Sequence, residues 1–375
     1  MPQDLHECEL YKKSEEGENK VECYCCSKRC IIEENSVGQC GVRFNQKGKL
    51  YLLVYGRPCA VHIDPVEKKP LYHFLPKTWI LSIGTIGCNF KCTFCQNWDI
   101  SQAVCSLRES LQNKETDIED VYNEFCATER YYSPEFLVNQ AKQKNCKSIA
   151  FTYNEPTIWG EYAHDIAKLA HENGLKCVYV TNGDMTEEHL KYIQPYVDAL
   201  NIDLKSWNPK FYRQLCGGNF QNVRRNIELA VEMGFWVEVT TLIIPGENDS
   251  DEELTKIAEF LYSVKPTLPW HISAFHPDYK MKEKTRTPEA TLKRAYAIGK
   301  NAGLKNIYMG NVHSHGAEDT FCCECGERLV KRDWYDVTVV GKEVFDGKCL
   351  KCGAKQDGVW ETEMWSVCLK RLREI

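Results

Sequence analysis

The sequence TWILSIGTIGCNFKCTFCQNWDIS, residues 78–101, joins a short apolar run to three closely spaced cysteines. The run at 79–84 is apolar and bounded by turn residues, which is typical of a buried strand. Cys88, Cys92 and Cys95 follow it with the spacing C-x3-C-x2-C. Two cysteine pairs would close a four-ligand metal site, but no other cysteine lies close enough in sequence to complete this set. We interpret the missing fourth ligand as the functional feature of the motif.

Strand and helix patterns alternate from about residue 76 to residue 316. The expected strands are 79–84, 148–153, 177–182, 199–204, 236–244 and 270–275, with a possible further one at 307–312. The expected helices between them are 134–144, 157–173, 186–196, 222–233, 250–264 and 287–301. This alternation predicts an α/β fold with a parallel sheet covered by helices. The number of units favours a partial barrel of (β/α)6 type, and no GxGxxG follows the first strand to support a Rossmann sheet, although the pattern alone leaves both open.

Residues 102–132 interrupt the alternation. They are polar, carry charges of both signs and show no clear period. We interpret them as an inserted surface loop or a loosely docked helix, and favour a neutral insertion over a lid.

The composition indicates a soluble globular protein. Hydrophobic residues make up 43% of the 375 residues, charged residues make up 27%, and the formal net charge is -6. This charge gives no general attraction to nucleic acid or to anionic lipid. No apolar run is long enough to span a bilayer, and the start lacks the apolar centre of a signal peptide. We therefore expect a cytoplasmic protein that binds neither nucleic acid nor membrane.

Two further cysteine clusters flank the central region, and the chain holds 21 cysteines in all. In a reducing compartment such clusters bind metal more often than they form disulfides. They divide the chain into an N-terminal cysteine-rich module (1–75), a core (76–316) and a C-terminal module (317–375). Cysteines such as Cys25 and Cys216 have no ligand spacing, and we expect several of them to be buried thiols.

The C-terminal cluster consists of two C-x2-C pairs, each followed by glycine. Its members are Cys322, Cys325, Cys349 and Cys352. Two such pairs facing each other supply four thiolates in the arrangement of a zinc ribbon, so we predict a structural zinc ion here. The module has slightly more acidic than basic residues, which favours a scaffold or protein-docking role over nucleic-acid binding.

The N-terminal cluster is less specific. Cys23, Cys26, Cys30 and Cys40 could hold zinc or a second, closed iron–sulfur cluster, because both accept four thiolates. The sequence leaves this open, with a slight preference for zinc.

The central trio directly follows the first expected strand, at the rim where β/α barrels build active sites. A four-iron cluster ordinarily takes one thiolate for each iron, so three thiolates leave one iron open to a ligand. A zinc site or unrelated thiols are the alternatives. With Phe94 before its last cysteine, the motif resembles the signature of radical S-adenosylmethionine (SAM) enzymes. The resemblance implies a 4Fe-4S cluster whose open iron binds the amino and carboxylate groups of SAM. One electron then cleaves SAM to methionine and a 5′-deoxyadenosyl radical, which abstracts hydrogen.

A closer resemblance is to the pyruvate formate-lyase-activating enzymes. Within that group the chain is most similar to the AmmeMemoRadiSam system radical SAM enzymes. Six stretches carry this resemblance: GQCGVRFNQKGKLYLLVYG (38–56), DPVEKKPLYHFLP (64–76), SIGTIGCNFKCTFCQNWDIS (82–101), YNEPTI (153–158), NIDLKS (201–206) and HISAFHPDYKM (271–281). It implies an external reductant such as flavodoxin or ferredoxin.

The resemblance also implies which residues hold SAM. Activating enzymes carry Gly-Gly-Glu-Pro after strand two, where this chain has Tyr153-Asn154-Glu155-Pro156. Glu155 with Asn154 would hold the ammonium group, although two larger residues replace the glycines. Further implied contacts come from the ends of later strands: Thr181, Asn182, Asp203, Lys205 and the rim residue His276. Asp203 and Lys205 would position the methionyl carboxylate, and period-two alternation puts both on one side of their strand.

The substrate does not follow from these motifs. Resemblance to activating enzymes implies hydrogen abstraction from a glycine of a partner protein. Radical modification of a small molecule or of another polypeptide is the alternative. A non-catalytic metal-binding scaffold is a hypothesis of a different class.

Overall fold

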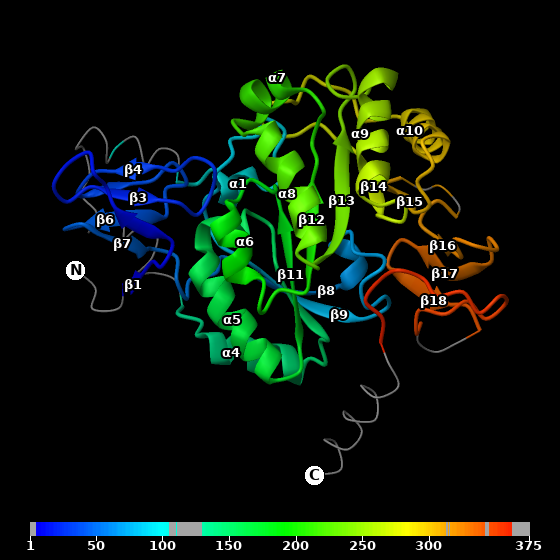
Figure 1. Cartoon of the computed structure of the whole chain (residues 1–375), viewed down its shortest axis with the longest axis horizontal. Helices are drawn as coiled ribbons and strands as arrows, with labels where there is room; N and C mark the ends of the chain where they lie inside the picture. Colours follow the sequence, from blue (N-terminus) through cyan, green and yellow to red (C-terminus); the bar gives the residue numbers. More distant parts are fainter. Residues whose placement is uncertain are drawn as a thin grey trace, which may run out of the picture.

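An eight-stranded sheet forms the centre of the protein (Figure 1). The computed structural model describes residues 5–104, 110, 130–312, 314, 316–341 and 345–361. The strands are β8 (Ala60–Pro65), β9 (Trp79–Gly84), β10 (Ser148–Phe151), β11 (Lys176–Thr181), β12 (Ala199–Asp203), β13 (Trp236–Ile243), β14 (Trp270–Ala274) and β15 (Ile307–Gly310). From β9 to β15 the strands are parallel and lie in chain order, whereas a Rossmann sheet reverses its order at a switch point. The predicted barrel-type α/β fold is confirmed.

The strand β8 was not expected as part of this sheet. It pairs antiparallel with β9, from Ala60 opposite Gly84 to Pro65 opposite Trp79. The sheet therefore begins inside the range 1–75. This edge strand was missed because pairing with β9 defines it, and its own sequence pattern does not identify that partner. Among the described strands β8 and β15 form the two edges, so the barrel is open. The division of the chain into three domains stays a prediction.

Helices connect the parallel strands and lie along the sheet in chain order (Figure 1). The main ones are α4 (Pro134–Gln143), α5 (Gly160–Glu172), α6 (Glu187–Ile193), α8 (Phe220–Glu232), α9 (Asp251–Val264) and α10 (Glu289–Asn301). Shorter turns are η1 (Val66–Lys68), α1 (Trp98–Ser101), η2 (Pro156–Trp159), α7 (Pro209–Phe211) and the π-helical η3 (Tyr212–Cys216). Side chains of Ser133, Thr186 and Ser250 cap α4, α6 and α9 by accepting backbone N–H groups, which is why these helices could be located from sequence. The predicted insertion at 102–132 lies mostly outside the described residues.

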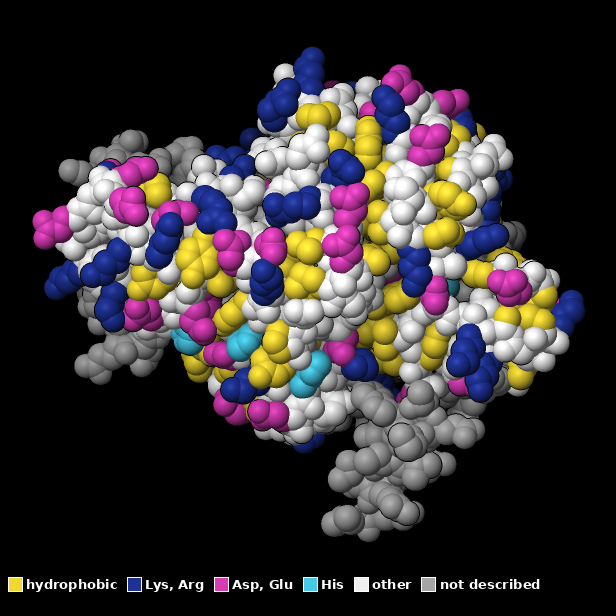
Figure 2. Space-filling view, viewed as in Figure 1, with side chains coloured by type: hydrophobic (Ala, Val, Ile, Leu, Met, Phe, Trp, Pro, Cys, Tyr) yellow, Lys and Arg dark blue, Asp and Glu magenta, His cyan; other side chains and the backbone are white. Residues whose placement is uncertain are grey.

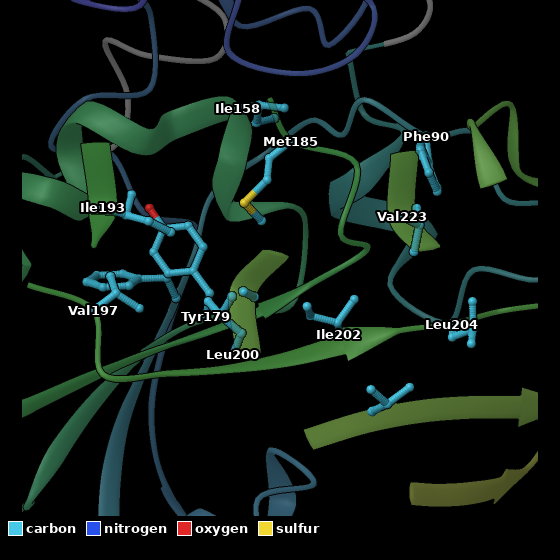
Figure 3. Packing of buried hydrophobic residues seen from close by; sticks show 14 of the residues in the cluster. Phe90, Ile158, Tyr179, Met185, Ile193, Val197, Leu200, Ile202, Leu204 and Val223 are labelled. Atoms are coloured by element: carbon cyan, nitrogen blue, oxygen red, sulfur yellow. The ribbon is translucent and has the colours of Figure 1, made fainter. Parts of the chain in front are cut away.

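The core fills the space between the sheet and its helices. Figure 3 shows part of it, where Tyr179 of β11 and Leu200 of β12 lie near Ile193 and Val197. These four side chains are almost fully buried. Their burial holds the strand ends, and therefore the loops that follow them, in fixed positions.

Small antiparallel sheets lie on opposite sides of the central sheet (Figure 1). The N-terminal pair contains β1 (His6–Glu7), β5 (Ser36–Val37), β6 (Arg43–Gln46) and β7 (Lys49–Leu52) in one sheet, and β2 (Tyr11–Lys13), β3 (Val21–Cys23) and β4 (Ile31–Ile32) in the other. The C-terminal sheet contains β16 (Thr320–Phe321), β17 (Arg328–Asp333) and β18 (Asp336–Val339).

Buried polar contacts attach both flanking regions. Arg43 of β6 forms an ion pair with Glu161 of α5, and both side chains are nearly inaccessible. On the other side, Arg332 of β17 donates to the carbonyl oxygen of Tyr72 over 2.9 Å. The backbone of Val359 exchanges two hydrogen bonds of 2.8 Å with residues 73 and 75.

Charges of both signs are mixed on the face shown in Figure 2. None of the described helices is both long and apolar enough to cross a membrane.

Candidate active site

A cavity of about 440 Å³ opens where the parallel strands end. The loops after β9, β10, β11 and β12 supply most of its wall, because the carboxyl ends of parallel strands meet at one edge of the sheet. The sequence-predicted residues that line it are Cys88, Cys92, Phe94, Cys95, Asn154, Glu155, Thr181, Asn182, Asp203 and Lys205. The structure thus brings ten predicted residues, from the ends of four strands and the loops that follow them, to one cavity.

The three cysteines could hold an iron–sulfur cluster at one end of this cavity. Cys92 is buried, and Cys88 and Cys95 are partly exposed. The backbone N–H of Phe90 points to Cys88 Sγ over 3.4 Å, and Ser101 Oγ lies 3.2 Å from Cys95 Sγ. Such donors stabilise thiolates and cluster sulfurs. Three thiolates beside an open space fit a four-iron cluster with one iron free to bind a ligand.

Cys216 lies directly behind the trio, which sequence reasoning did not anticipate. The side chain of Cys216 lowers the pKa of the Cys92 thiol. The backbone carbonyl of Cys216 accepts from Lys91 N over 2.7 Å, and Leu215 O accepts from Thr93 N over 2.8 Å. Cys216 is not among the described residues that line the cavity. It therefore supports the cysteine loop from outside the cavity, and only the paired backbones, not a sequence spacing, bring it there.

Glu155 is buried at the centre of a hydrogen-bond network. Its Oε1 accepts from Thr157 N (3.1 Å), Thr157 Oγ1 (2.6 Å) and Thr181 Oγ1 (2.7 Å), and its Oε2 accepts from Asn182 N (2.7 Å). Pro156 opens the turn η2 directly after it, so the carboxylate caps that turn. Burial raises the pKa of Glu155, and these donors oppose the shift. The carboxylate is held in one orientation, with Oε2 the less occupied oxygen.

The side chain of Asn154 is committed to the loop before Cys88. Its Nδ2 donates to Thr85 Oγ1 over 3.0 Å and to Gly87 O over 2.9 Å, while its Oδ1 accepts from Thr85 N and Trp159 Nε1, both over 3.2 Å. Both lone pairs of Oδ1 are used, so the side chain has no acceptor left for the expected contact with an ammonium group.

Tyr153 occupies a backbone position that normally favours glycine. Its φ is 71°, in the left-handed region. Its hydroxyl donates to Asp64 Oδ2 over 3.0 Å, and Lys69 Nζ lies 4.7 Å from its ring centroid. These contacts hold a tyrosine in a left-handed conformation, so the backbone path after β10 in this chain does not require glycine.

Thr181 and Asn182 orient other residues of the wall. In addition to the bond from Thr181 to Glu155, Asn182 Nδ2 donates to Asn89 Oδ1 over 2.8 Å. Asn182 Oδ1 accepts from Asp184 N over 2.9 Å. The last residue of β11 and the residue after it therefore link Glu155 to the cysteine loop.

Asp203 and Lys205 form an ion pair on the cavity wall. Lys205 Nζ lies 2.6 Å from Asp203 Oδ2 and 6.0 Å from the centroid of Phe94. Burial opposes the charge of Lys205, but the attraction of Asp203 and nearby thiols outweighs it and raises the lysine pKa well above its usual value. Both side chains face the cavity, as the period-two alternation predicts.

His276 is the one predicted ligand contact that lies outside this wall. It follows β14 and is exposed. The cavity instead has Ser273 and Asn311 on that side, joined by a hydrogen bond of 2.9 Å from Asn311 Nδ2 to Ser273 Oγ.

The flanking cysteine clusters differ in geometry. The C-terminal sulfurs of Cys322, Cys325, Cys349 and Cys352 all lie within 4.8 Å of one another and could hold a metal ion. Cys322 Sγ lies 3.6 Å from Cys352 Sγ, and Cys325 Sγ lies 3.7 Å from Cys349 Sγ. Cys23, Cys26, Cys30 and Cys40 line a separate, small cavity.

Comparison with known proteins places the chain in a family. The family model of the radical SAM superfamily matches residues 82–261. This chain belongs to the radical SAM superfamily. It is 39% identical to an uncharacterized protein of Methanocaldococcus jannaschii, with 94% of this chain and 99% of that protein covered.

Two more distant relatives differ in what their names describe. A putative glycyl-radical enzyme activating enzyme of Methanocaldococcus jannaschii is 25% identical, over 52% of this chain and 67% of that protein. A GTP 3′,8-cyclase of Haemophilus influenzae is 24% identical, over 51% of this chain and 50% of that protein. Membership of the superfamily implies SAM and a 4Fe-4S cluster as cofactors. The assignment to the AmmeMemoRadiSam branch stays a prediction.

Proposed function

We propose that this protein cleaves SAM reductively and uses the product radical to abstract hydrogen from a substrate. The observation that supports it most strongly is the convergence of three cysteines, a buried carboxylate and an aspartate–lysine pair on one cavity. A 4Fe-4S cluster on Cys88, Cys92 and Cys95 would supply the electron that converts SAM to methionine and a 5′-deoxyadenosyl radical. An external one-electron donor such as flavodoxin or ferredoxin would reduce the cluster.

Glu155 and Lys205 are the proposed contacts for the methionyl end of SAM. Within the described part of the chain, Glu155 Oε2 accepts a hydrogen bond from Asn182 N alone, so it can still accept one from an ammonium group. Lys205 can donate to the carboxylate of SAM, while Asp203 holds the lysine side chain on the wall. The ammonium group of SAM would thus meet the Glu155 carboxylate, and the carboxylate of SAM would meet the Lys205 ammonium group.

Other predicted residues act through these contacts. Asn154 is a proposed positioning residue that fixes the loop before Cys88, in place of the direct ammonium contact expected from sequence. Thr181 and Asn182 orient Glu155. His276 remains a proposed nucleoside contact at the rim.

A glycine of a partner protein is the proposed substrate. The name of the relative at 25% identity supports it, because activating a glycyl-radical enzyme means acting on a polypeptide. The relative named as a GTP cyclase favours the alternative, a small molecule.

Product analysis tests the chemistry. Anaerobically reconstituted protein is mixed with dithionite and SAM, and 5′-deoxyadenosine is quantified. The proposal predicts 5′-deoxyadenosine from the wild type and from Cys146→Ala, whose cysteine is buried away from the cavity wall, but none from Cys92→Ala. A wild type that carries the cluster and forms no 5′-deoxyadenosine is a non-catalytic scaffold. A partner protein with deuterated glycine would transfer deuterium into 5′-deoxyadenosine if it is the substrate.

A further inference from the structure

The N-terminal cysteines enclose a space of their own. Cys23, Cys26, Cys30 and Cys40 line a small cavity whose wall also includes Asn89 from the central cysteine loop. Cys23 ends β3 and is 6% exposed, and Cys40 is 8% exposed. Four cysteines from two segments of the chain therefore line one small cavity, as thiolates do around a metal centre.

Cys25 lines the same cavity but is accounted for by other partners. Its Sγ donates to Thr157 O over 2.7 Å and lies 3.4 Å from His189 Nδ1. A thiol that donates a hydrogen bond retains its proton, whereas a metal ligand must lose it. The candidate ligands are therefore Cys23, Cys26, Cys30 and Cys40, and Cys25 is not one of them.

The separation of the sulfurs distinguishes the metals. A zinc ion with Zn–S bonds of about 2.3 Å keeps its tetrahedral sulfurs about 3.8 Å apart. The C-terminal pairs, at 3.6 and 3.7 Å, match this value. Within the described residues, no three of the N-terminal sulfurs lie within 4.8 Å of one another, and the same holds for Cys88, Cys92 and Cys95.

We infer that Cys23, Cys26, Cys30 and Cys40 bind a second 4Fe-4S cluster rather than zinc. A cubane places four irons and four sulfides between the thiolates, so its cysteines stand farther apart than those of a zinc tetrahedron and surround a space. The N-terminal set shares both features with the central trio and neither with the C-terminal set. This geometry reverses the slight preference for zinc that the sequence carried.

The second cluster lies directly behind the first. Gly87, the residue before Cys88, approaches Cys40 so closely that a Cβ atom on it would lie 2.7 Å from Cys40 O. Asn89 lines the N-terminal cavity and accepts a hydrogen bond from Asn182 of the central cavity. The segment that contains Gly87 and Asn89 therefore lies between the two sites.

This position and coordination assign an electron-carrying role. Each iron of the second cluster has its own thiolate, so none is open to substrate. The cluster takes one electron from an external one-electron donor protein and gives one electron to the central cluster. The inference goes beyond the proposed function, and the metal content that tests it does not depend on turnover.

Metal content of the anaerobically reconstituted full chain tests the inference. We expect roughly eight irons and one zinc in the wild type, because each cubane holds four irons. The variant Cys88→Ala/Cys92→Ala/Cys95→Ala should keep roughly four irons and, after reduction, the electron paramagnetic resonance (EPR) signal of a 4Fe-4S cluster. Two zincs in the wild type, or no iron in this variant, would overturn the inference.

A second pair of variants isolates the N-terminal ligands. Cys30→Ser/Cys40→Ser should lose the iron of the second cluster and keep that of the central one. Cys25→Ser is the matched control, since serine can still donate to Thr157 O, and it should keep both clusters. Equal iron content in the double variant and the control would contradict the assignment. If the double variant does not fold, the iron content of the central-trio variant decides.

Discussion

Glu155 shows how the site is built at the scale of single residues. Four donors, two on Thr157 of η2 and two at the end of β11, hold its carboxylate, and one oxygen keeps room for a ligand. This residue could be predicted because it follows a strand and belongs to a motif, as do the cysteines, Asp203 and Lys205. Cys216 could not, since only the pairing of two loops brings it to Cys92.

Glu155→Gln tests the proposed ammonium contact. A charge-assisted hydrogen bond contributes about 1.5–3 kcal/mol, so we expect the Kd for SAM to rise roughly 10- to 100-fold. Anaerobic calorimetric titration measures it, with iron content checked alongside. Glu232→Gln, an exposed change at the end of α8, should leave the Kd unaltered. An unchanged Kd in Glu155→Gln with full iron content would remove Glu155 from the binding site.

At the scale of elements, local signals specified the parallel strands and most helices. Capping residues and short β-branched runs depend on neighbours in sequence, so they are visible without the fold. The strand β8 and the packing of the N-terminal cysteines behind the central loop depend on distant partners. Gly87 belongs to the second group, because its need for a small residue comes from Cys40.

Gly87→Ala tests this close approach. Gly87 has a φ of 89°, and an alanine there would also overlap Cys40 O and Val42. Gly174→Ala is the control, because its φ is 71° but nothing lies within 4 Å of the added atom. The left-handed conformation costs alanine about 1–2 kcal/mol in both variants. We expect Gly87→Ala to lose clearly more free energy of unfolding in urea, and some iron. Equal losses would show that the two chain segments are not in contact.

At the scale of the whole molecule, three cysteine sites lie along one chain. Among the described residues of these sites, only the C-terminal set brings three or more sulfurs within 4.8 Å of one another. A spacing pattern in the sequence cannot separate these cases, because zinc and iron clusters accept the same ligands. His73 links the C-terminal region to the central sheet. Its Nδ1 lies 2.8 Å from Asp357 O of the C-terminal region, and its Nε2 lies 2.5 Å from the hydroxyl of Tyr308 in β15.

His73 predicts a pH dependence of stability. Burial lowers its pKa to about 4, against the attraction of Glu238. An unfolded histidine takes up a proton near pH 6.5, so between pH 6.5 and 4 the unfolded state binds more protons than the folded state. The free energy of unfolding should therefore fall on acidification through this window, by up to about 3 kcal/mol from this group.

The variant His73→Asn should show a shallower fall. Urea unfolding at pH 7.5, 6.5 and 5.5 measures the slope, and His62→Asn, at an exposed position, should keep the slope of the wild type. Equal slopes in wild type and His73→Asn would assign the acid sensitivity to other groups, such as the buried His189.

The central claim is that one iron of the cluster on Cys88, Cys92 and Cys95 is open and binds SAM. EPR of the reduced protein, with and without SAM, tests it most directly. We predict that SAM changes the spectrum of the wild type, whereas the signal left in Cys88→Ala/Cys92→Ala/Cys95→Ala does not respond. A wild-type spectrum that SAM leaves unchanged, or zinc bound to the central trio, would contradict the account.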